Sequence, residues 1–181
     1  FNNALKKLFP ELDRSDMNGF TIDSRLVQKG DLYLPIKGKN VDGHDHIPEA
    51  IFNGAVLIIY EKSSIDIEVA SVKVESTIET LKNLAIIYGE QINCPIIGIT
   101  GSNGKTTTKE LLHHILCNYK KTMCNYGNYN STIGLPISMF TIDDDDEFCI
   151  LEMGASEPNE ITILCEIAKP SIGLITNISA A

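Results

Sequence analysis

Hydrophobic positions follow two different patterns along the chain, and the pattern changes near residue 92. Before that point, short apolar runs predict strands over residues 20–23, 31–36, 55–60 and 69–74. A helix is expected over residues 46–53, because Gly54 then interrupts its pattern. Apolar residues recur at helical spacing over residues 77–92, which predicts a helix that joins the two parts of the chain.

After residue 92 the pattern becomes a regular alternation of strands and helices. Strands are predicted over residues 96–100, 121–125, 148–152 and 172–178, and helices over residues 105–116, 132–140 and 159–168. Such an alternation is typical of a parallel sheet with helices on its faces, in which ligands bind at the carboxyl ends of the strands. The expected fold class is therefore α/β, with a small mixed α/β N-terminal domain followed by a parallel-sheet domain.

The composition is that of an ordinary globular protein. Of 181 residues, 43% are hydrophobic, and 15 basic against 24 acidic side chains give a formal charge of 15 − 24 = −9. These values exclude a disordered chain, and the acidic balance argues against binding nucleic acid by neutralising its phosphates. The longest apolar run, over residues 55–60, is far shorter than the roughly 18 residues of a membrane helix, and no signal pattern is present. We therefore expect a cytoplasmic protein without membrane insertion.

Neither the cysteines nor the densest acidic stretch predicts a metal site. The five cysteines are widely spaced, with no Cys-x-x-Cys pair and no His at zinc spacing, so buried free thiols are expected. The acidic residues over 143–147 are interpreted as a solvated loop between two elements.

A phosphate-binding loop is the strongest chemical signal, and it lies between a predicted strand and a predicted helix. Glycines let backbone N–H groups turn toward phosphate oxygens, and the start of the helix adds partial positive charge. Lys105 would reach the terminal phosphates, and the Thr106 hydroxyl would bind Mg²⁺. The pattern is a shorter Gly-x-x-Gly-Lys-Thr variant, since Ile99 stands where the longer pattern has Gly. The residues expected to bind the nucleotide are Gly101, Ser102, Asn103, Gly104, Lys105, Thr106 and Thr107.

A magnesium ion needs oxygen ligands besides the hydroxyl and the phosphates, and a carboxylate is typically among them. Glu152 is the candidate, because it ends an apolar run and should emerge at the carboxyl edge of a buried strand, beside the loop. A Glu that faces solvent at a strand end is the alternative. The residues alone therefore indicate an enzyme that uses ATP or GTP, with Thr106 and Glu152 as metal ligands.

Several segments together resemble the Mur ligases, the amide-bond-forming enzymes of peptidoglycan synthesis. The loop over residues 98–107 resembles their ATP loop. Glu-Met-Gly at 152–154 and Gly-Asn-Tyr-Asn at 127–130 favour the branch that joins D-alanyl-D-alanine to UDP-N-acetylmuramoyl-tripeptide. The other matching segments are residues 21–25 with 30–31, 38–44, 131–136, 151–155 and 175–178.

The resemblance implies a domain organisation. Residues 1–78 would form the domain that holds the UDP end of the substrate, residues 79–92 a connecting helix, and residues 93–181 an ATP-binding central domain. This central domain would be a truncated P-loop-type ATPase domain. We accordingly expect the chain to be an N-terminal part of a longer ligase that does not ligate by itself.

The resemblance also implies substrate contacts. Asn128 and Asn130 match the loop that meets the substrate near its diphosphate, where amide donors can bond phosphate oxygens. Asn177 lies in a matching motif at the end of the last predicted strand, where capping of the following turn is the alternative. Without the resemblance, residues 23–25 would be interpreted as a turn and His44 as a surface residue. The residues expected to contact the UDP end are Ser24, Arg25, Asp42, Gly43 and His44.

The implied reaction uses ATP and Mg²⁺, with Lys105 and Glu152 as catalytic residues. ATP phosphorylates the terminal carboxylate of the tripeptide, and the amine of D-alanyl-D-alanine then displaces phosphate from the acyl phosphate. The implied partners are UDP-N-acetylmuramoyl-tripeptide and D-alanyl-D-alanine, with no nucleic acid, and a monomer is expected. Three alternatives stay open: a Mur ligase that adds a single amino acid, a non-catalytic nucleotide-binding module, and a P-loop kinase or switch NTPase.

Overall fold

The computed structural model describes residues 1–12, 17–62 and 66–179, and the chain divides into two compact units. One unit comprises Asn2–Leu81, and the other runs from Lys82 onward and includes Phe1. The division falls inside the helix α3 (Thr77–Gly89), so the first residues of α3 belong to one unit and the remainder to the other.

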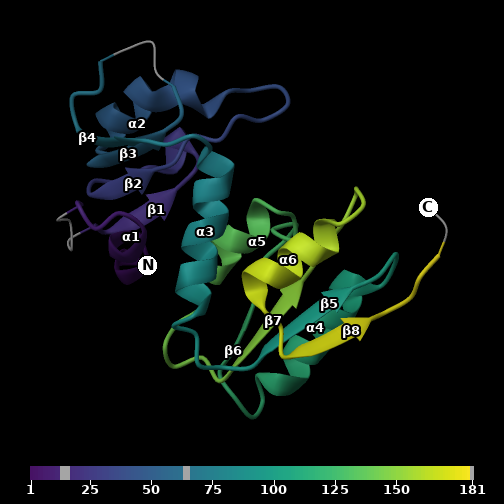
Figure 1. Cartoon of the computed structure of the whole chain (residues 1–181). Helices are drawn as coiled ribbons and strands as arrows, with labels where there is room; N and C mark the ends of the chain where they lie inside the picture. Colours follow the sequence, from purple (N-terminus) through teal and green to yellow (C-terminus); the bar gives the residue numbers. More distant parts are fainter. Residues whose placement is uncertain (13–16, 63–65, 180–181) are drawn as a thin grey trace. The chain divides into compact units, whose positions relative to one another are not determined.

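The Asn2–Leu81 unit is built on parallel strands in the order β1-β2-β3-β4 (Figure 1). The strands and the helix predicted for this part of the chain all form, although each strand is shorter than the hydrophobic pattern suggests. The helix α1 and the 3₁₀ turns η1 and η2 have no counterpart among the predicted elements, because each is too short to show a clear helical period. The elements are α1 (Asn2–Leu8), β1 (Gly19–Thr21), η1 (Ser24–Leu26), β2 (Asp31–Tyr33), η2 (Gly43–His46), α2 (Ile47–Asn53), β3 (Leu57–Tyr60) and β4 (Ala70–Lys73).

The core of this unit lies between the sheet and α2. Ile58 and Ile59 of β3 are fully buried, as expected for a parallel strand with a neighbour on each side. Ile47 and Ala50 of α2 pack in the same cluster as Ile58. The helix ends at Gly54, whose φ of 109° is a conformation that favours glycine.

The second unit carries a parallel sheet with the strand order β6-β7-β5-β8. The central strand β5 pairs with β7 on one side and β8 on the other. The bounds of β5, α4 and β7 are those that the sequence predicts. The elements are β5 (Ile96–Thr100), α4 (Lys105–Leu116), β6 (Thr122–Cys124), α5 (Gly134–Met139), β7 (Phe148–Glu152), α6 (Glu160–Ala168) and β8 (Ile172–Ile175).

Helices cover both faces of this sheet (Figure 1). On one face, Leu112 and Leu116 of α4 pack against Ile97 and Ile150. The alternate strand residues, such as Leu151, face a second cluster formed with α5, α6 and the later residues of α3. This two-sided burial explains why the strands have continuous apolar runs.

The carboxyl ends of the strands bring distant segments to one edge of the sheet. Ile99 of β5 pairs with Glu152 at the end of β7, and Cys124 at the end of β6 pairs with Ile150. The loop after β5, the segment after β6 and the Glu152 side chain therefore lie close together.

Two expectations from the sequence are corrected. The strand β8 ends at Ile175 instead of residue 178, because the residues that follow bond to the phosphate loop, as described below. The cysteines are free thiols as predicted, but burial holds for Cys149 alone: Cys117 is exposed, and Cys94, Cys124 and Cys165 are partly exposed. Cys149 is buried, and this burial raises the pKa of its thiol. No helix within the described ranges is both long and apolar enough to cross a lipid bilayer.

Candidate functional site

Two glycines fix the shape of the phosphate loop between β5 and α4. Gly101 has a φ of 137°, and a Cβ atom there would lie 2.2 Å from Thr176 Oγ1. Gly104 is the N-cap of α4 with a φ of 80°. Both φ values favour glycine, so the backbone path requires both glycines of the Gly-x-x-Gly pattern.

Residues that follow β8 form hydrogen bonds with the phosphate loop. Asn177 accepts two hydrogen bonds: the Ser102 N–H donates to its main-chain oxygen at 3.1 Å, and the Asn103 N–H donates to Oδ1 at 2.9 Å. The Thr176 hydroxyl donates to Asn103 O at 2.6 Å, and the Ser102 hydroxyl donates to Ser179 O at 3.2 Å. The Asn177 side chain thus serves to order the phosphate loop.

The first turn of α4 offers further amides to a ligand. N–H groups in the first turn of a helix have no acceptor within the helix, and Gly104 supplies no side-chain cap. The amides of Lys105, Thr106 and Thr107 belong to this turn. The Lys105 ammonium lies against the loop, where Nζ donates to Gly101 O at 2.6 Å. Amides and a cation in this arrangement suit an anion such as phosphate.

Glu152 joins the phosphate loop to the neighbouring strand. Its Oε2 accepts a hydrogen bond from the Thr106 hydroxyl, and its Oε1 accepts one from the Asn130 amide, both at 2.8 Å. Glu152 is 3% exposed, which excludes the alternative of a strand-end Glu that faces solvent. The structure therefore brings the two predicted metal ligands together, with Asn130 beside them.

Gly154 makes room for the Asn130 side chain. A Cβ atom at position 154 would lie 3.0 Å from Asn130 Cγ, and the Gly154 N–H donates to Asn130 O at 2.9 Å. Asn128 is exposed, and its main-chain oxygen accepts from the Asn130 N–H at 2.8 Å. Of the two asparagines expected near the substrate diphosphate, Asn130 is thus the one turned toward Glu152.

Two residues that the sequence pattern does not single out support this edge of the sheet. Asn125 is fully buried, and its side chain donates to Tyr129 O at 2.8 Å and to Glu152 O at 3.0 Å. Lys109 is also buried, and its Nζ donates to Asn125 O at 2.7 Å. The signal that could have indicated Lys109 is its position three residues before Leu112, on the apolar side of α4.

In the Asn2–Leu81 unit, Ser24 and Arg25 lie in η1, which is capped by Asp23. The Arg25 guanidinium donates to both carboxylate oxygens of Asp23, at 2.9 and 2.6 Å, and this contact lowers the pKa of Asp23. The Ser24 hydroxyl is buried and donates to Glu49 Oε2 at 2.6 Å. Of this predicted pair, Arg25 is the residue that faces solvent.

The second predicted segment, with Asp42 and His44, forms η2. The Asp42 carboxylate caps this turn, and Asp42 Oδ1 lies 2.7 Å from His44 Nδ1. His44 Nε2 accepts a hydrogen bond from the Glu61 N–H at 3.0 Å, so in the neutral ring the proton is on Nδ1. Burial opposes ionisation of Asp42, but hydrogen bonds from His44 and Lys62 outweigh it and lower the pKa of Asp42 to about 2. His44 is buried and is not a surface residue.

Tyr33 of β2 links these two segments. Its hydroxyl donates to Gly43 O at 2.8 Å. Burial raises the pKa of Tyr33 to about 12, and the carboxylates of Asp23, Glu49 and Asp42 act in the same direction. The three carboxylates come from both predicted substrate segments and from α2, so the structure brings these segments together around one hydroxyl. The contacts of these residues with a substrate stay a prediction.

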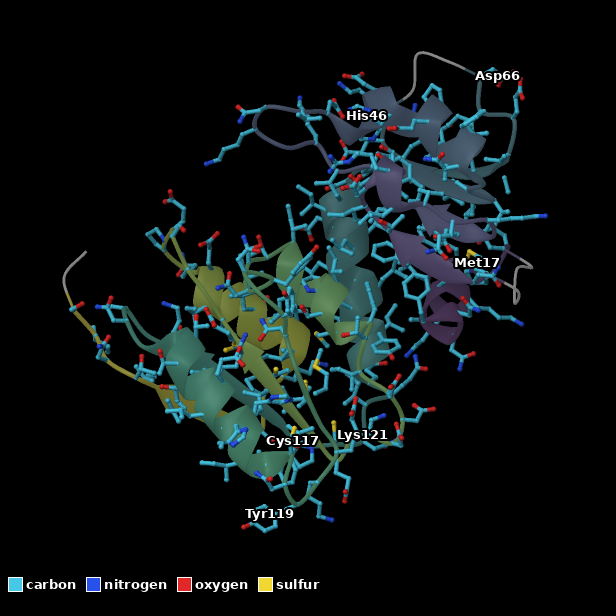
Figure 2. The ribbon with its side chains drawn as sticks, turned by 180° about the vertical axis from the view of Figure 1, so that it is seen from behind. Met17, His46, Asp66, Cys117, Tyr119 and Lys121 are labelled. Carbon is cyan, nitrogen blue, oxygen red and sulfur yellow. The ribbon has the colours of Figure 1, made fainter. Side chains whose placement is uncertain are left out.

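The acidic stretch over 143–147 lies at the amino-terminal ends of β6 and β7, at the opposite end of these strands from the phosphate loop. Lys121 Nζ lies 3.2 Å from the Asp143 carboxylate. Figure 2 shows Lys121 together with Cys117 and Tyr119 near the C-terminal end of α4. The structure describes no group of three or more His, Cys, Asp or Glu side chains that could hold a metal ion. The stretch is a loop between elements, as the sequence indicates, but it is not solvated throughout: Asp146 is buried and accepts a hydrogen bond from the Asp143 N–H at 2.8 Å.

Family comparisons cover almost the entire chain. The model for the catalytic domain of the Mur ligase family matches residues 16–99, and the model for the Mur ligase middle domain matches residues 99–181. The chain belongs to the Mur ligase family.

Individual relatives of this Mur ligase chain agree with the branch that the sequence favours. The UDP-N-acetylmuramoyl-tripeptide–D-alanyl-D-alanine ligase of Synechocystis is 37% identical over 167 residues, which cover 91% of this chain and 37% of that protein. The crystal structure of MurF from Acinetobacter baumannii has a TM-score of 0.92 at 30% identity, over 99% of this chain and 41% of that one. The structure of MurF ligase from Thermotoga maritima, in complex with ADP, has a TM-score of 0.84 at 38% identity, over 94% of this chain and 40% of that one.

These comparisons confirm the α/β fold class of this Mur ligase chain. The chain spans about two fifths of the length of the relatives it matches.

Proposed function

We propose that the chain is the substrate-binding and ATP-binding part of a UDP-N-acetylmuramoyl-tripeptide–D-alanyl-D-alanine ligase. The names of its relatives and the ADP complex of the Thermotoga maritima neighbour support this proposal. The Asn2–Leu81 unit would hold the UDP end of the substrate. Arg25 would make a direct contact there, because it is the exposed member of its pair, and buried Ser24 would support the turn through Glu49. The segment with Asp42, Gly43 and His44 would complete the site.

The proposed reaction has two steps. A carboxylate oxygen of the tripeptide attacks the γ-phosphorus of ATP, the bond between that phosphorus and the bridging oxygen breaks, and ADP leaves. The amine nitrogen of D-alanyl-D-alanine then attacks the carbonyl carbon of the acyl phosphate. The carbon–oxygen bond breaks, phosphate leaves, and the nitrogen loses a proton. Negative charge accumulates on the transferred phosphoryl group, so positive groups and oriented N–H groups are what the site must supply.

The residues of the phosphate loop can supply them. Lys105 and the amides of Thr106 and Thr107 would bind the terminal phosphates of ATP and fix their orientation. The donor set also fits Mg²⁺, because the Thr106 hydroxyl and the buried Glu152 carboxylate are oxygen ligands of the kind this ion prefers, and they lie 2.8 Å apart. When bound, Mg²⁺ neutralises phosphate charge. Thr106 and Glu152 would hold it, and Asn130 would orient the Glu152 carboxylate.

The contact between Thr106 and Glu152 is the observation that carries the proposal. A Gly-rich turn without a nucleotide has no need of a buried carboxylate against its first helical turn. A non-catalytic nucleotide-binding module is the alternative from another class, and the retention of Lys105 beside this pair argues against it. The names of the relatives argue against a ligase that adds a single amino acid.

Calorimetric titration of the chain tests the two binding sites separately. We expect ADP to bind more tightly with Mg²⁺ than without it, and UDP-N-acetylmuramoyl-tripeptide to bind more tightly than UDP alone. A chain that does not bind ADP contradicts the ATP assignment. A chain that binds ADP but neither UDP ligand contradicts the assignment of the Asn2–Leu81 unit.

We further propose that these 181 residues do not ligate without the rest of a longer enzyme, that they are monomeric, and that they act in the cytoplasm, where ATP is available. The share of the relatives that the chain covers supports the first of these statements. Incubation with ATP, Mg²⁺ and both substrates should give no amide product, and robust product formation would contradict it. Light scattering should give a mass near 19.9 kDa.

A further inference from the structure

Lys109 occupies a core position of α4. It is 1% exposed and lies three residues before Leu112 and seven before Leu116, and both leucines pack against the sheet. An apolar side chain is expected at such a position, because a buried ammonium is costly unless it is paired and hydrogen-bonded. Packing alone therefore does not explain a lysine here.

The Lys109 ammonium is bound at the carboxyl end of β6. Its Nζ donates to Asn125 O at 2.7 Å and lies 3.2 Å from Glu110 Oε1. Glu110 is exposed, so its carboxylate pairs with the buried ammonium from the solvent side. Lys109 thus connects α4 to Asn125, the first residue of the segment that leads from β6 to Asn130.

The Asn125 side chain continues this connection to the end of β7. Its Nδ2 donates to Glu152 O at 3.0 Å, and its Oδ1 accepts from the Glu152 N–H at 2.8 Å. The same Nδ2 donates to Tyr129 O at 2.8 Å. The buried Asn125 amide therefore binds both the N–H and the carbonyl oxygen of Glu152, and it also binds the carbonyl oxygen of Tyr129, the residue before Asn130.

Together with the main chain of α4 between Thr106 and Lys109, these hydrogen bonds form a closed ring of contacts. Thr106 binds the Glu152 carboxylate, Asn125 binds the Glu152 main chain, and Lys109 binds the Asn125 main chain. Thr106 and Lys109 are three residues apart on α4 and so are neighbours on its surface. The position of the Glu152 carboxylate is thereby fixed relative to the phosphate loop through both its side chain and its backbone.

We infer that Lys109 and Asn125 are positioning residues for the magnesium ligand Glu152. The inference rests on the proposed function, in which Glu152 and Thr106 hold Mg²⁺. Neither Lys109 nor Asn125 contacts a phosphate or the metal in this assignment. They restrict where the Glu152 carboxylate can lie, and loss of such supporting contacts typically weakens metal affinity by about 10- to 100-fold.

Lys109→Met tests the inference, because Met has a similar length and no charge. The substitution removes the cost of burying an ammonium but leaves Asn125 O without its donor. These two effects oppose each other, so the melting temperature should change little. The gain in ADP affinity that Mg²⁺ provides should fall by roughly tenfold, while ADP affinity without Mg²⁺ stays unchanged. Lys120→Met, at an exposed lysine shortly after α4, is the matched control and should leave both affinities unchanged.

Amide hydrogen exchange supplies a readout that is independent of ligands. The Glu152 N–H donates to Asn125 Oδ1, so its exchange reports directly on the ring. In Lys109→Met, exchange should accelerate at Glu152 and Asn130 and stay unchanged in the middle of β5. A lysine that acted only on overall stability would change exchange throughout the sheet.

A folded Lys109→Met variant that keeps the full magnesium effect on ADP binding overturns the inference. If this variant does not fold, Asn125→Asp tests the same ring, because it keeps the size and the Oδ1 acceptor and removes both Nδ2 hydrogen bonds. An unchanged magnesium effect in Asn125→Asp then overturns it. A wild-type chain whose ADP affinity does not respond to Mg²⁺ contradicts the proposed function instead.

Discussion

The Thr106 hydroxyl donates a 2.8 Å hydrogen bond to the Glu152 carboxylate across 46 positions of sequence. The sheet creates this contact, because Ile99 of β5 pairs with Glu152 of β7 and the phosphate loop begins two residues after Ile99. A hydroxyl on a helix and a carboxylate on a neighbouring strand are thus held together by strand register.

Thr106→Val removes the hydroxyl at nearly constant volume. We expect the unfolding free energy to fall by about 1–3 kcal/mol, because a buried Glu152 oxygen loses its donor. The gain in ADP affinity from Mg²⁺ should also be lost. Urea unfolding and calorimetry measure these effects, and Thr108→Val, two residues further along α4, should change neither. A Thr106→Val chain with an intact magnesium effect would exclude Thr106 as a metal ligand.

Gly101→Ala should disrupt the phosphate loop. The φ of 137° strains any other residue, and the new Cβ atom would lie 2.2 Å from Thr176 Oγ1. Backbone strain alone costs on the order of 1–3 kcal/mol, so we expect at least that loss in unfolding free energy, together with loss of ADP binding. Gly173→Ala is the matched control, because no atom lies within 4 Å of its Cβ position. Equal thermal stability of the two variants would contradict the loop geometry.

Asp42→Asn should change the pH dependence of stability. The pKa of Asp42 is about 2, below its ordinary value of 3.8, so ionised Asp42 stabilises the folded state above about pH 4. This contribution is lost as the pH falls from about 4 toward 2. The difference in unfolding free energy between wild type and Asp42→Asn should therefore be constant from pH 5 to 7 and shrink below pH 4. A difference that grew on acidification would refute the argument.

Lys105→Ala should abolish turnover in a complete ligase that contains this sequence. Removal of one preorganised charge-stabilising donor typically costs about 10²–10³ in kcat, so we expect a loss of at least that size. Binding of UDP-N-acetylmuramoyl-tripeptide should persist, which separates a phosphate defect from misfolding. Ligation at a near-normal rate would remove Lys105 from the mechanism.

Much of the second unit could be predicted from its sequence. The bounds of β5, α4 and β7 follow from apolar runs that are buried on both faces and from the glycines that separate strand and helix. The proximity of Thr106 and Glu152 also follows, since carboxyl ends of parallel strands meet at one edge.

The supporting contacts could not be predicted, for physical reasons. Lys109 is a residue type that is almost always exposed, and nothing in its neighbours indicates that Asn125 O lies within reach. The bonds of Asn125 to both sides of Glu152 depend on the register between β6 and β7, which periodicity does not determine. The end of β8 at Ile175 depends on Asn177 as an acceptor for the phosphate loop, a contact across 74 positions.

That last contact also places the nucleotide site in the order of folding. Contacts between distant residues form late, because the entropy of closing a long loop must be lost before they are made. A growing polypeptide synthesised as far as β7 already contains Gly101, Lys105 and Glu152, but not the Asn177 acceptors that hold the Ser102 and Asn103 amides. The Ser102 and Asn103 amides therefore gain these acceptors only after the chain beyond β8 has been synthesised and β8 has joined the sheet.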